Sequence, residues 1–249
     1  MNSISFSATS IINLDNKTAV ILAPVMAAWD YGQFCEPLTF QLNHHGFDVT
    51  VIDTLSVLTT SNLDFSLHKL KDILSSITNG KPFLIGGVAL GGALAQRLSC
   101  ELPNINRVIS ISGPTFPSQD LNTKLSSLIE ILENDNLEVA MNQLYDWLPP
   151  KNGYEMEAPI IESSISTDAI DRMISGFSIL KQIDARKSIK EFKGKTLLIV
   201  GELSQMVSKE NLLKNYQSPT YTASIISNAG MRPWQDNEKQ SYKTVEKWL

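Results

Sequence analysis

A short apolar run that ends in glycines and leads directly into a helical pattern is the feature that most constrains the fold. Residues 83–88 (Phe-Leu-Ile-Gly-Gly-Val) are typical of a buried strand, and residues 93–98 (Ala-Leu-Ala-Gln-Arg-Leu) favour a helix. The chain must therefore turn sharply near Ala89, and Gly87 and Gly91 give that turn the clearance it needs. A buried strand that passes at once into a helix predicts an α/β architecture.

Composition excludes several classes of protein. The 249 residues suffice for one α/β domain, and 43% hydrophobic with 19% charged residues is ordinary for a globular chain. The net charge is −5, and lysines and arginines are scattered, so we expect no nucleic-acid partner. The N-terminus lacks a signal-peptide pattern and no run is long enough to span a membrane, so we expect a cytoplasmic protein with no membrane partner. Cys35 and Cys100 lack metal-ligand spacing and are expected to be free, buried thiols.

Strand-like and helix-like segments alternate along most of the chain. The first 16 residues are compatible with an edge strand or a hairpin. The expected strands that follow are residues 17–22, 47–52, 83–88, 107–112, 196–200 and 221–226. The expected helices are residues 32–45, 64–77, 93–98, 121–133, 137–147, 167–183, 207–216 and 235–249. This alternation predicts a mostly parallel, doubly wound sheet with right-handed crossovers.

The alternation is interrupted once. About seventy residues after the strand that ends near Ser112 contain helical patterns and no strand. We expect a helical cap over the strand ends, at about residues 115–185. The core would then comprise residues 1–114 and 186–249 of a single domain that spans residues 1–249.

This layout resembles the α/β-hydrolase superfamily, particularly its small esterases and the menaquinone-pathway enzyme that eliminates pyruvate. The resemblance covers nearly the whole chain. It rests on the strand that contains Val20, the turn at Gly87–Gly92, the cap, the stretch before Gly201-Glu202, and Asn228-Ala229-Gly230 before the last helix. The turn resembles the family's nucleophile elbow, G-x-S-x-G, in which a serine stands at the tip above the sheet. Here the tip is Ala89.

In that family a serine attacks, a histidine carries the proton and an aspartate orients the histidine. Carried over by position, the nucleophile falls on Ala89, the acid on Ser204 and the base on Met231. None of these side chains performs its family role. The resemblance therefore implies a catalytic triad that has degenerated by natural sequence change.

The family's oxyanion hole uses backbone N–H groups, so it does not depend on these side chains. The resemblance assigns those donors to Val25 and Leu90, although Pro24 constrains the path of the loop. We expect a largely apolar cavity at the elbow. The residues expected to contact a ligand there are Val25, Met26, Trp29, Asp30, Tyr31, Ala89, Leu90 and Met231. The alternative is that core side chains fill this space entirely.

No other residue is a strong substitute for the lost groups. His44, His45 and His68 fall on expected outer helices, and Glu202 at a strand end is more readily explained as structural. Cys35 has no neighbouring base in the sequence, so its thiol is expected to be a poor nucleophile. We expect no metal and no cofactor.

Three hypotheses for function remain. In the first, the protein is a non-hydrolytic pseudoenzyme that binds a small, largely apolar acyl or aromatic compound, or a protein partner. In the second, it is a cofactor-independent lyase, cyclase or isomerase of a biosynthetic pathway that uses the former hydrolase pocket. In the third, it is a structural subunit with a filled core.

Overall fold

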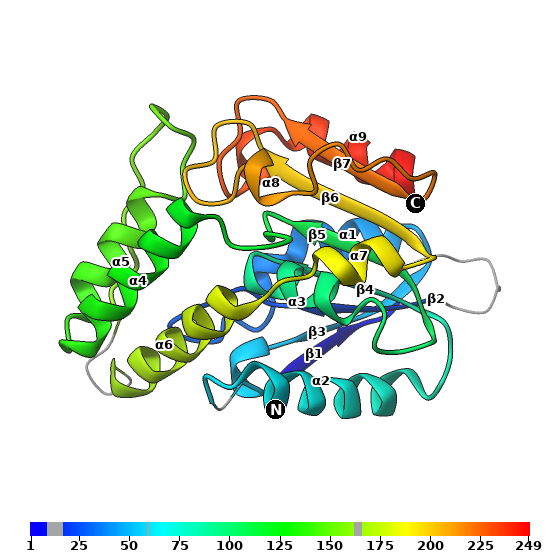
Figure 1. The fold of residues 1–249 in the computed structure, drawn as a ribbon, viewed down its shortest axis with the longest axis horizontal. Helices are drawn as coiled ribbons and strands as arrows, with labels where there is room; N and C mark the ends of the chain where they lie inside the picture. Colours follow the sequence, from blue (N-terminus) through cyan, green and yellow to red (C-terminus); the bar gives the residue numbers. More distant parts are fainter. Residues whose placement is uncertain (9–16, 59, 162–165) are drawn as a thin grey trace.

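The computed structural model describes residues 1–8, 17–58, 60–161 and 166–249, and a single twisted sheet organises them (Figure 1). Within these residues the sheet has seven strands in the order β1-β3-β2-β4-β5-β6-β7. The strands are β1 (Ser3–Phe6), β2 (Lys17–Leu22), β3 (Phe47–Ile52), β4 (Phe83–Val88), β5 (Ile105–Ile111), β6 (Lys195–Gly201) and β7 (Tyr221–Ile226). Only β1 is antiparallel, to β3, and it forms one edge. The predicted mostly parallel sheet is confirmed.

Helices cover both faces of the sheet, which explains why the central strands are apolar along their whole length. One face packs against α2 (Leu63–Thr78), α3 (Leu90–Leu98) and α7 (Arg186–Glu191). The other packs against α1 (Glu36–His44) and α9 (Glu238–Trp248), which follows the single turn of α8 (Pro233–Asp236). Alternate residues of the central strands therefore contribute to two separate hydrophobic clusters, one on each side of the sheet.

Three helices between β5 and α7 form the predicted strand-free insertion. They are α4 (Gln119–Glu133), α5 (Leu137–Asp146) and α6 (Ser166–Gln182). Figure 1 shows α4 and α5 standing beyond one end of the strands, with α6 leading back toward the sheet. Leucines of α4 (Leu121, Leu125 and Leu128) are fully buried and join the hydrophobic cluster of the α2–α3 face. We call α4, α5, α6 and their connections the helical insertion.

Most expected elements form within one or two residues of their predicted bounds. Three expected helices differ: α1 begins at Glu36 instead of residue 32, α3 begins at Leu90 instead of residue 93, and residues 235–249 are divided between α8 and α9. One further expected helix does not form. Residues 207–216 were expected to form a helix, but only a 3-10 turn, Lys209–Asn211, is found there. The Ser208 hydroxyl accepts a hydrogen bond from the Glu210 N–H, and the Asn211 side chain accepts one from the Ser208 N–H. This reciprocal capping satisfies the turn locally, and Asn215 then takes a left-handed conformation with a φ of 56°. The helix prediction was wrong for that reason.

The expected N-terminal edge strand is β1, while residues 9–16 lie outside the described part of the chain. Cys35 is buried as expected, but Cys100, just after α3, is exposed, so the expectation of two buried thiols was wrong for Cys100.

Among the described helices, none is long and apolar enough to cross a bilayer.

Candidate functional site

A cavity of about 320 Å³ lies between the carboxyl ends of the strands and the helical insertion. Its floor comes from segments that follow β2, β4, β6 and β7, and its roof from α4, α5 and α6. Most lining side chains are aliphatic, aromatic or methionine, and five of the seven methionines of the chain are among them. Methionine is flexible and polarizable, so such walls adapt to ligands of different shape. Core side chains therefore do not fill the space above the elbow.

Ala89 stands at the centre of the cavity floor, in the backbone conformation of a sharp strand-to-helix turn. Its φ is 48° and its ψ is −112°, which is strained for a residue with a side chain. The turn depends on glycine at Gly91, because a Cβ there would lie 1.9 Å from the carbonyl oxygen of Leu22. The elbow geometry expected from the sequence is thus present, with a methyl group where a serine hydroxyl would project.

Two backbone amides beside Ala89 have no hydrogen-bond acceptor among the described residues. Leu90 is the first residue of α3, where the N–H has no intrahelical acceptor, and Val25 lies in the loop after β2. Both residues line the cavity. Backbone N–H groups without an acceptor can donate hydrogen bonds to a carbonyl oxygen or a carboxylate. The sequence led us to expect such donors at Val25 and Leu90.

Ser204, at the acid position, is outside the cavity lining. Its Oγ is buried and has no hydrogen-bond partner among the described residues. Glu202 is exposed and accepts a hydrogen bond from the Asn228 N–H over 3.1 Å, so it supports the loop after β7. Neither side chain reaches the cavity with a group that could orient a base.

Met231, at the base position, does line the cavity and is 6% exposed. The loop that carries it is fixed on both sides. The Met231 N–H donates to the Leu148 carbonyl over 2.9 Å, and the Gly230 N–H donates to the Asp236 carboxylate over 2.7 Å. The side chain at the expected base position is therefore an apolar thioether in a loop held by hydrogen bonds.

The expected contacts in the loop after β2 divide into two groups. Met26 and Asp30 line the cavity with Val25, whereas Trp29 and Tyr31 do not. Tyr31 is 71% exposed at φ 57°, and Trp29 packs against the hydrophobic cluster of the α1–α9 face. Of the contacts expected in this loop, Trp29 and Tyr31 are therefore the two that the structure does not bring to the cavity.

Asp30 is engaged by its own loop. Its two carboxylate oxygens accept hydrogen bonds from the N–H groups of Gly32, over 2.9 Å, and Phe34, over 2.7 Å. These bonds form an Asx-type turn that holds the backbone of Phe34, whose side chain lines the cavity. The Asp30 carboxylate therefore stabilises this loop, and both of its oxygens are already engaged in hydrogen bonds within the loop.

Arg232 is the site residue that the sequence reasoning missed. It lines the cavity next to Met231, and its guanidinium carbon lies 5.1 Å from the Phe34 ring centroid and 5.4 Å from that of Tyr145. Both rings also line the cavity. The one signal in the sequence was a cation directly after the base position. Its importance depends on Tyr145 in α5, a long-range neighbour that no local pattern reveals.

Other candidate nucleophiles and bases lie elsewhere. None of the three histidines is among the described residues that line the cavity. Cys35 is buried at the N-terminus of α1, where burial and, to a smaller extent, the Asp30 carboxylate raise the pKa of its thiol. A thiol with a raised pKa is a weak nucleophile. In the part of the chain that the structure describes, no group of three acidic, histidine or cysteine side chains could hold a metal ion.

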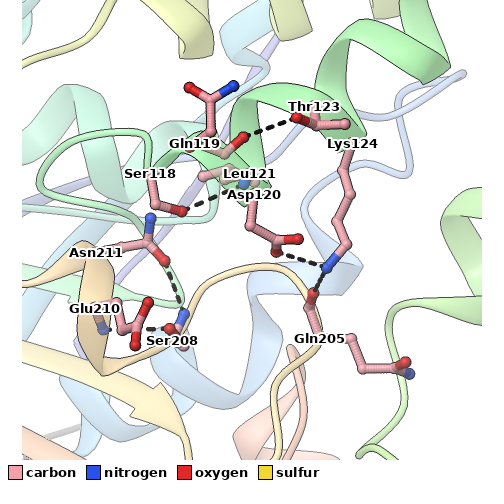
Figure 2. Close-up of polar contacts among 10 residues, drawn as sticks. All are labelled: Ser118, Gln119, Asp120, Leu121, Thr123, Lys124, Gln205, Ser208, Glu210 and Asn211. Carbon is pink, nitrogen blue, oxygen red and sulfur yellow. Dashed lines mark hydrogen bonds and ion pairs between the residues drawn. The ribbon is translucent and has the colours of Figure 1, made fainter.

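Polar contacts attach the helical insertion to the loop that contains Ser204 (Figure 2). Lys124 of α4 donates to the Asp120 carboxylate over 2.8 Å and also to the backbone carbonyl of Gln205. The Gln205 side chain donates in turn to the carbonyls of Asp146, over 3.0 Å, and Pro149, over 3.2 Å. The roof of the cavity is therefore tied to the core beside the acid position.

Comparison with known proteins adds information at the level of structure only. No family model and no curated protein matches the sequence. Among solved structures, an α/β hydrolase enzyme, MGS-M2, from a Medee basin deep-sea metagenome library superposes with a TM-score of 0.74 at 15% identity, covering 99% of this chain and 93% of that one. This chain has the α/β-hydrolase fold.

Two further solved structures show how varied proteins with the α/β-hydrolase fold are. An esterase from Exiguobacterium antarcticum has a TM-score of 0.73 at 15% identity, with 99% of this chain and 94% of that chain covered. MenH from S. aureus has a TM-score of 0.63 at 14% identity, with 99% and 97% covered. At these identities the likeness supports the predicted α/β-hydrolase fold and does not extend to activity.

Proposed function

We propose that this α/β-hydrolase-fold protein is a pseudo-hydrolase that binds a small, largely apolar acyl or aromatic compound without hydrolysing it. The observation that carries the proposal is the cavity at the elbow. Its floor carries Ala89 and Met231 at the nucleophile and base positions, and no histidine is among its described lining residues. Without a nucleophile and a base, the proton transfers of ester hydrolysis have no group to perform them.

The volume and chemistry of the cavity support binding. At about 320 Å³ it falls within the range of small-molecule sites, and its walls are mostly apolar with few polar groups. A structural subunit with a filled core would not need this space. The third hypothesis from the sequence is therefore disfavoured.

One observation favours a second candidate, a non-hydrolytic enzyme of the lyase, cyclase or isomerase type. Val25 and Leu90 line the cavity, and their backbone N–H groups have no acceptor among the described residues. They could stabilise an enolate or another oxyanion as well as hold a bound carbonyl. Turnover of a bound compound, with no ester cleavage, would distinguish this candidate from simple binding.

Displacement of a neutral fluorescent probe, N-phenyl-1-naphthylamine, tests the proposed binding. We expect the probe to bind one site per chain and to be displaced by octanamide and octanoate. Ala28 is exposed and lines the cavity, so Ala28→Trp should obstruct it at little cost in stability. The matched control is Ala223→Trp, at an exposed alanine of β7 far from the cavity.

The two variants separate the outcomes. Binding that Ala28→Trp weakens at least tenfold and Ala223→Trp leaves unchanged supports the proposal. Probe binding that neither substitution alters would place the probe elsewhere on the protein and overturn the proposal.

A further inference from the structure

Arg232 is the single cation among the described residues that line the cavity, and it has no ionic partner there. No ion pair and no side-chain hydrogen bond of Arg232 is found in the described part of the chain, and its Nε is buried without an acceptor. Buried polar nitrogens are nearly always hydrogen-bonded in native proteins. An arginine left without an acceptor at a cavity wall therefore calls for an explanation.

The guanidinium is held in place although nothing accepts its hydrogen bonds. It lies within cation–π distance of two rings, at 5.1 Å from Phe34 and 5.4 Å from Tyr145. Phe34 is fixed by the hydrogen bond from its N–H to Asp30, and Tyr145 belongs to α5. The two rings restrain the guanidinium from more than one element, and its N–H groups have no acceptor among the described residues.

The backbone that carries Arg232 is equally constrained. Its carbonyl accepts hydrogen bonds from the N–H groups of Gln235, over 3.0 Å, and Asp236, over 3.1 Å, which starts α8. Pro233 follows at the first position of that helix. The arginine is therefore positioned before any ligand arrives, which lowers the entropic cost of binding one.

We infer that the cavity takes an amphipathic monocarboxylate, whose carboxylate pairs with Arg232 and whose apolar body lies among the methionine and leucine side chains. The inference rests on the proposed function and specifies the chemical class of its ligand. A planar fork of N–H donors matches a carboxylate in two parallel hydrogen bonds. A phosphate dianion fits less well, because the other charged lining residue in the described chain is the carboxylate of Asp30.

Isothermal titration calorimetry with octanoate and octanamide tests this inference on the full chain. The two compounds share size and shape but differ in charge. We expect octanoate to bind the native protein at least tenfold more tightly than octanamide. In Arg232→Met the affinity for octanoate should fall at least tenfold, while that for octanamide should stay within about twofold, because the methionine side chain keeps the wall apolar.

The matched control is Arg107→Met. Arg107 lies on β5 at the opposite end of the sheet, with its guanidinium carbon 5.9 Å from the Trp248 ring centroid. The variant removes a charge and a cation–π contact of the same kind, and both affinities should be unchanged. Octanamide binding to Arg232→Met also reports whether that variant keeps its fold.

The failures of the two proposals are distinguishable. Equal affinity for octanoate and octanamide in the native protein, or octanoate binding that survives Arg232→Met, would overturn the role of Arg232 and leave the apolar binding function in place. Failure of both compounds to bind the native protein would overturn both proposals.

Discussion

The backbone N–H of Met231 donates a hydrogen bond to the carbonyl oxygen of Leu148 over 2.9 Å, so the base position is attached directly to the segment after α5. Three residues on, the Lys151 N–H donates to the Leu203 carbonyl over 2.8 Å, beside the acid position. The segment 148–151 therefore joins the helical insertion to both loops that carry chemistry in active hydrolases. Because these bonds use backbone atoms, side-chain substitutions in the cavity should leave its roof in place.

The close packing of α3 on β2 gives a prediction for stability. Gly91→Ala should lower the free energy of unfolding by about 3 kcal/mol or more, since the new Cβ would lie 1.9 Å from the Leu22 carbonyl oxygen. Gly80→Ala is the control, because nothing lies within 4 Å of a Cβ there, although its φ is +73°. The control should cost about 1 kcal/mol. Urea unfolding measures both, and equal losses would contradict the close contact at Gly91.

The ion pair between Arg172 and Asp53 gives a second prediction, for the attachment of α6. The Arg172 guanidinium donates to both Asp53 oxygens, over 2.9 and 3.2 Å, and the Asp53 side chain is 2% exposed. Arg172→Met leaves that carboxylate buried without its cation, so we expect a loss of about 3 kcal/mol in thermal or urea unfolding.

The exposed pair Lys187–Glu191 is the control for that prediction, with side chains 84% and 58% exposed. Lys187→Met should change stability by about 0.5 kcal/mol or less, because water screens the pair. A loss in Arg172→Met as small as that of the control would mean that Arg172 and Asp53 do not attach α6 to the segment after β3.

Thiol reactivity gives a third prediction. Burial raises the pKa of both cysteine thiols, far more for the buried Cys35 than for the exposed Cys100. At pH 8 we expect 5,5′-dithiobis(2-nitrobenzoate) to modify one thiol of the folded protein slowly and the second only after unfolding. Cys100→Ser should abolish the first reaction. Rapid modification of Cys35 in the folded state would show that its thiol is accessible and ionised, against the structure.

Introducing the family's three triad side chains at the expected positions gives a fourth prediction. Ala89 keeps the elbow conformation, so Ala89→Ser should place a hydroxyl beside the Leu90 N–H without distorting the turn. Alone it should hydrolyse p-nitrophenyl butyrate no faster than the native protein, because no histidine is among the described lining residues and the Asp30 carboxylate is engaged by the N–H groups of its own loop. The triple variant A89S/S204D/M231H should exceed it by at least about a hundredfold, the usual contribution of a general base. Activity in Ala89→Ser equal to that of the triple variant would reveal a base that the structure does not identify.

Local sequence patterns predicted most of the helices and strands. Strands such as 17–22, 47–52 and 221–226 were predicted with the bounds that the structure has, because continuous apolar runs bounded by turn residues specify buried parallel strands. The helix expected at 207–216 failed because the Ser208–Asn211 capping interaction outweighed its apolar spacing. Helix propensity is a weak guide where a polar side chain can satisfy the backbone locally.

The candidate site was only partly predictable. Positional comparison placed Ala89, Leu90 and Met231 on one surface, and the structure brings these three together at the cavity. The position of Arg232 depends on where α5 packs against the loop after β7, and that contact joins residues almost ninety positions apart in the sequence, Tyr145 and Arg232. No local pattern specifies such a contact, because it arises from tertiary packing.

Hydrolysis of p-nitrophenyl butyrate by the native protein tests the central claim most directly, with Ala28→Trp as the control for the cavity. We predict a rate equal to that of buffer alone, the same in both proteins. Saturable hydrolysis by the native protein that Ala28→Trp abolishes would contradict the account, because it would require a working nucleophile and base inside the cavity.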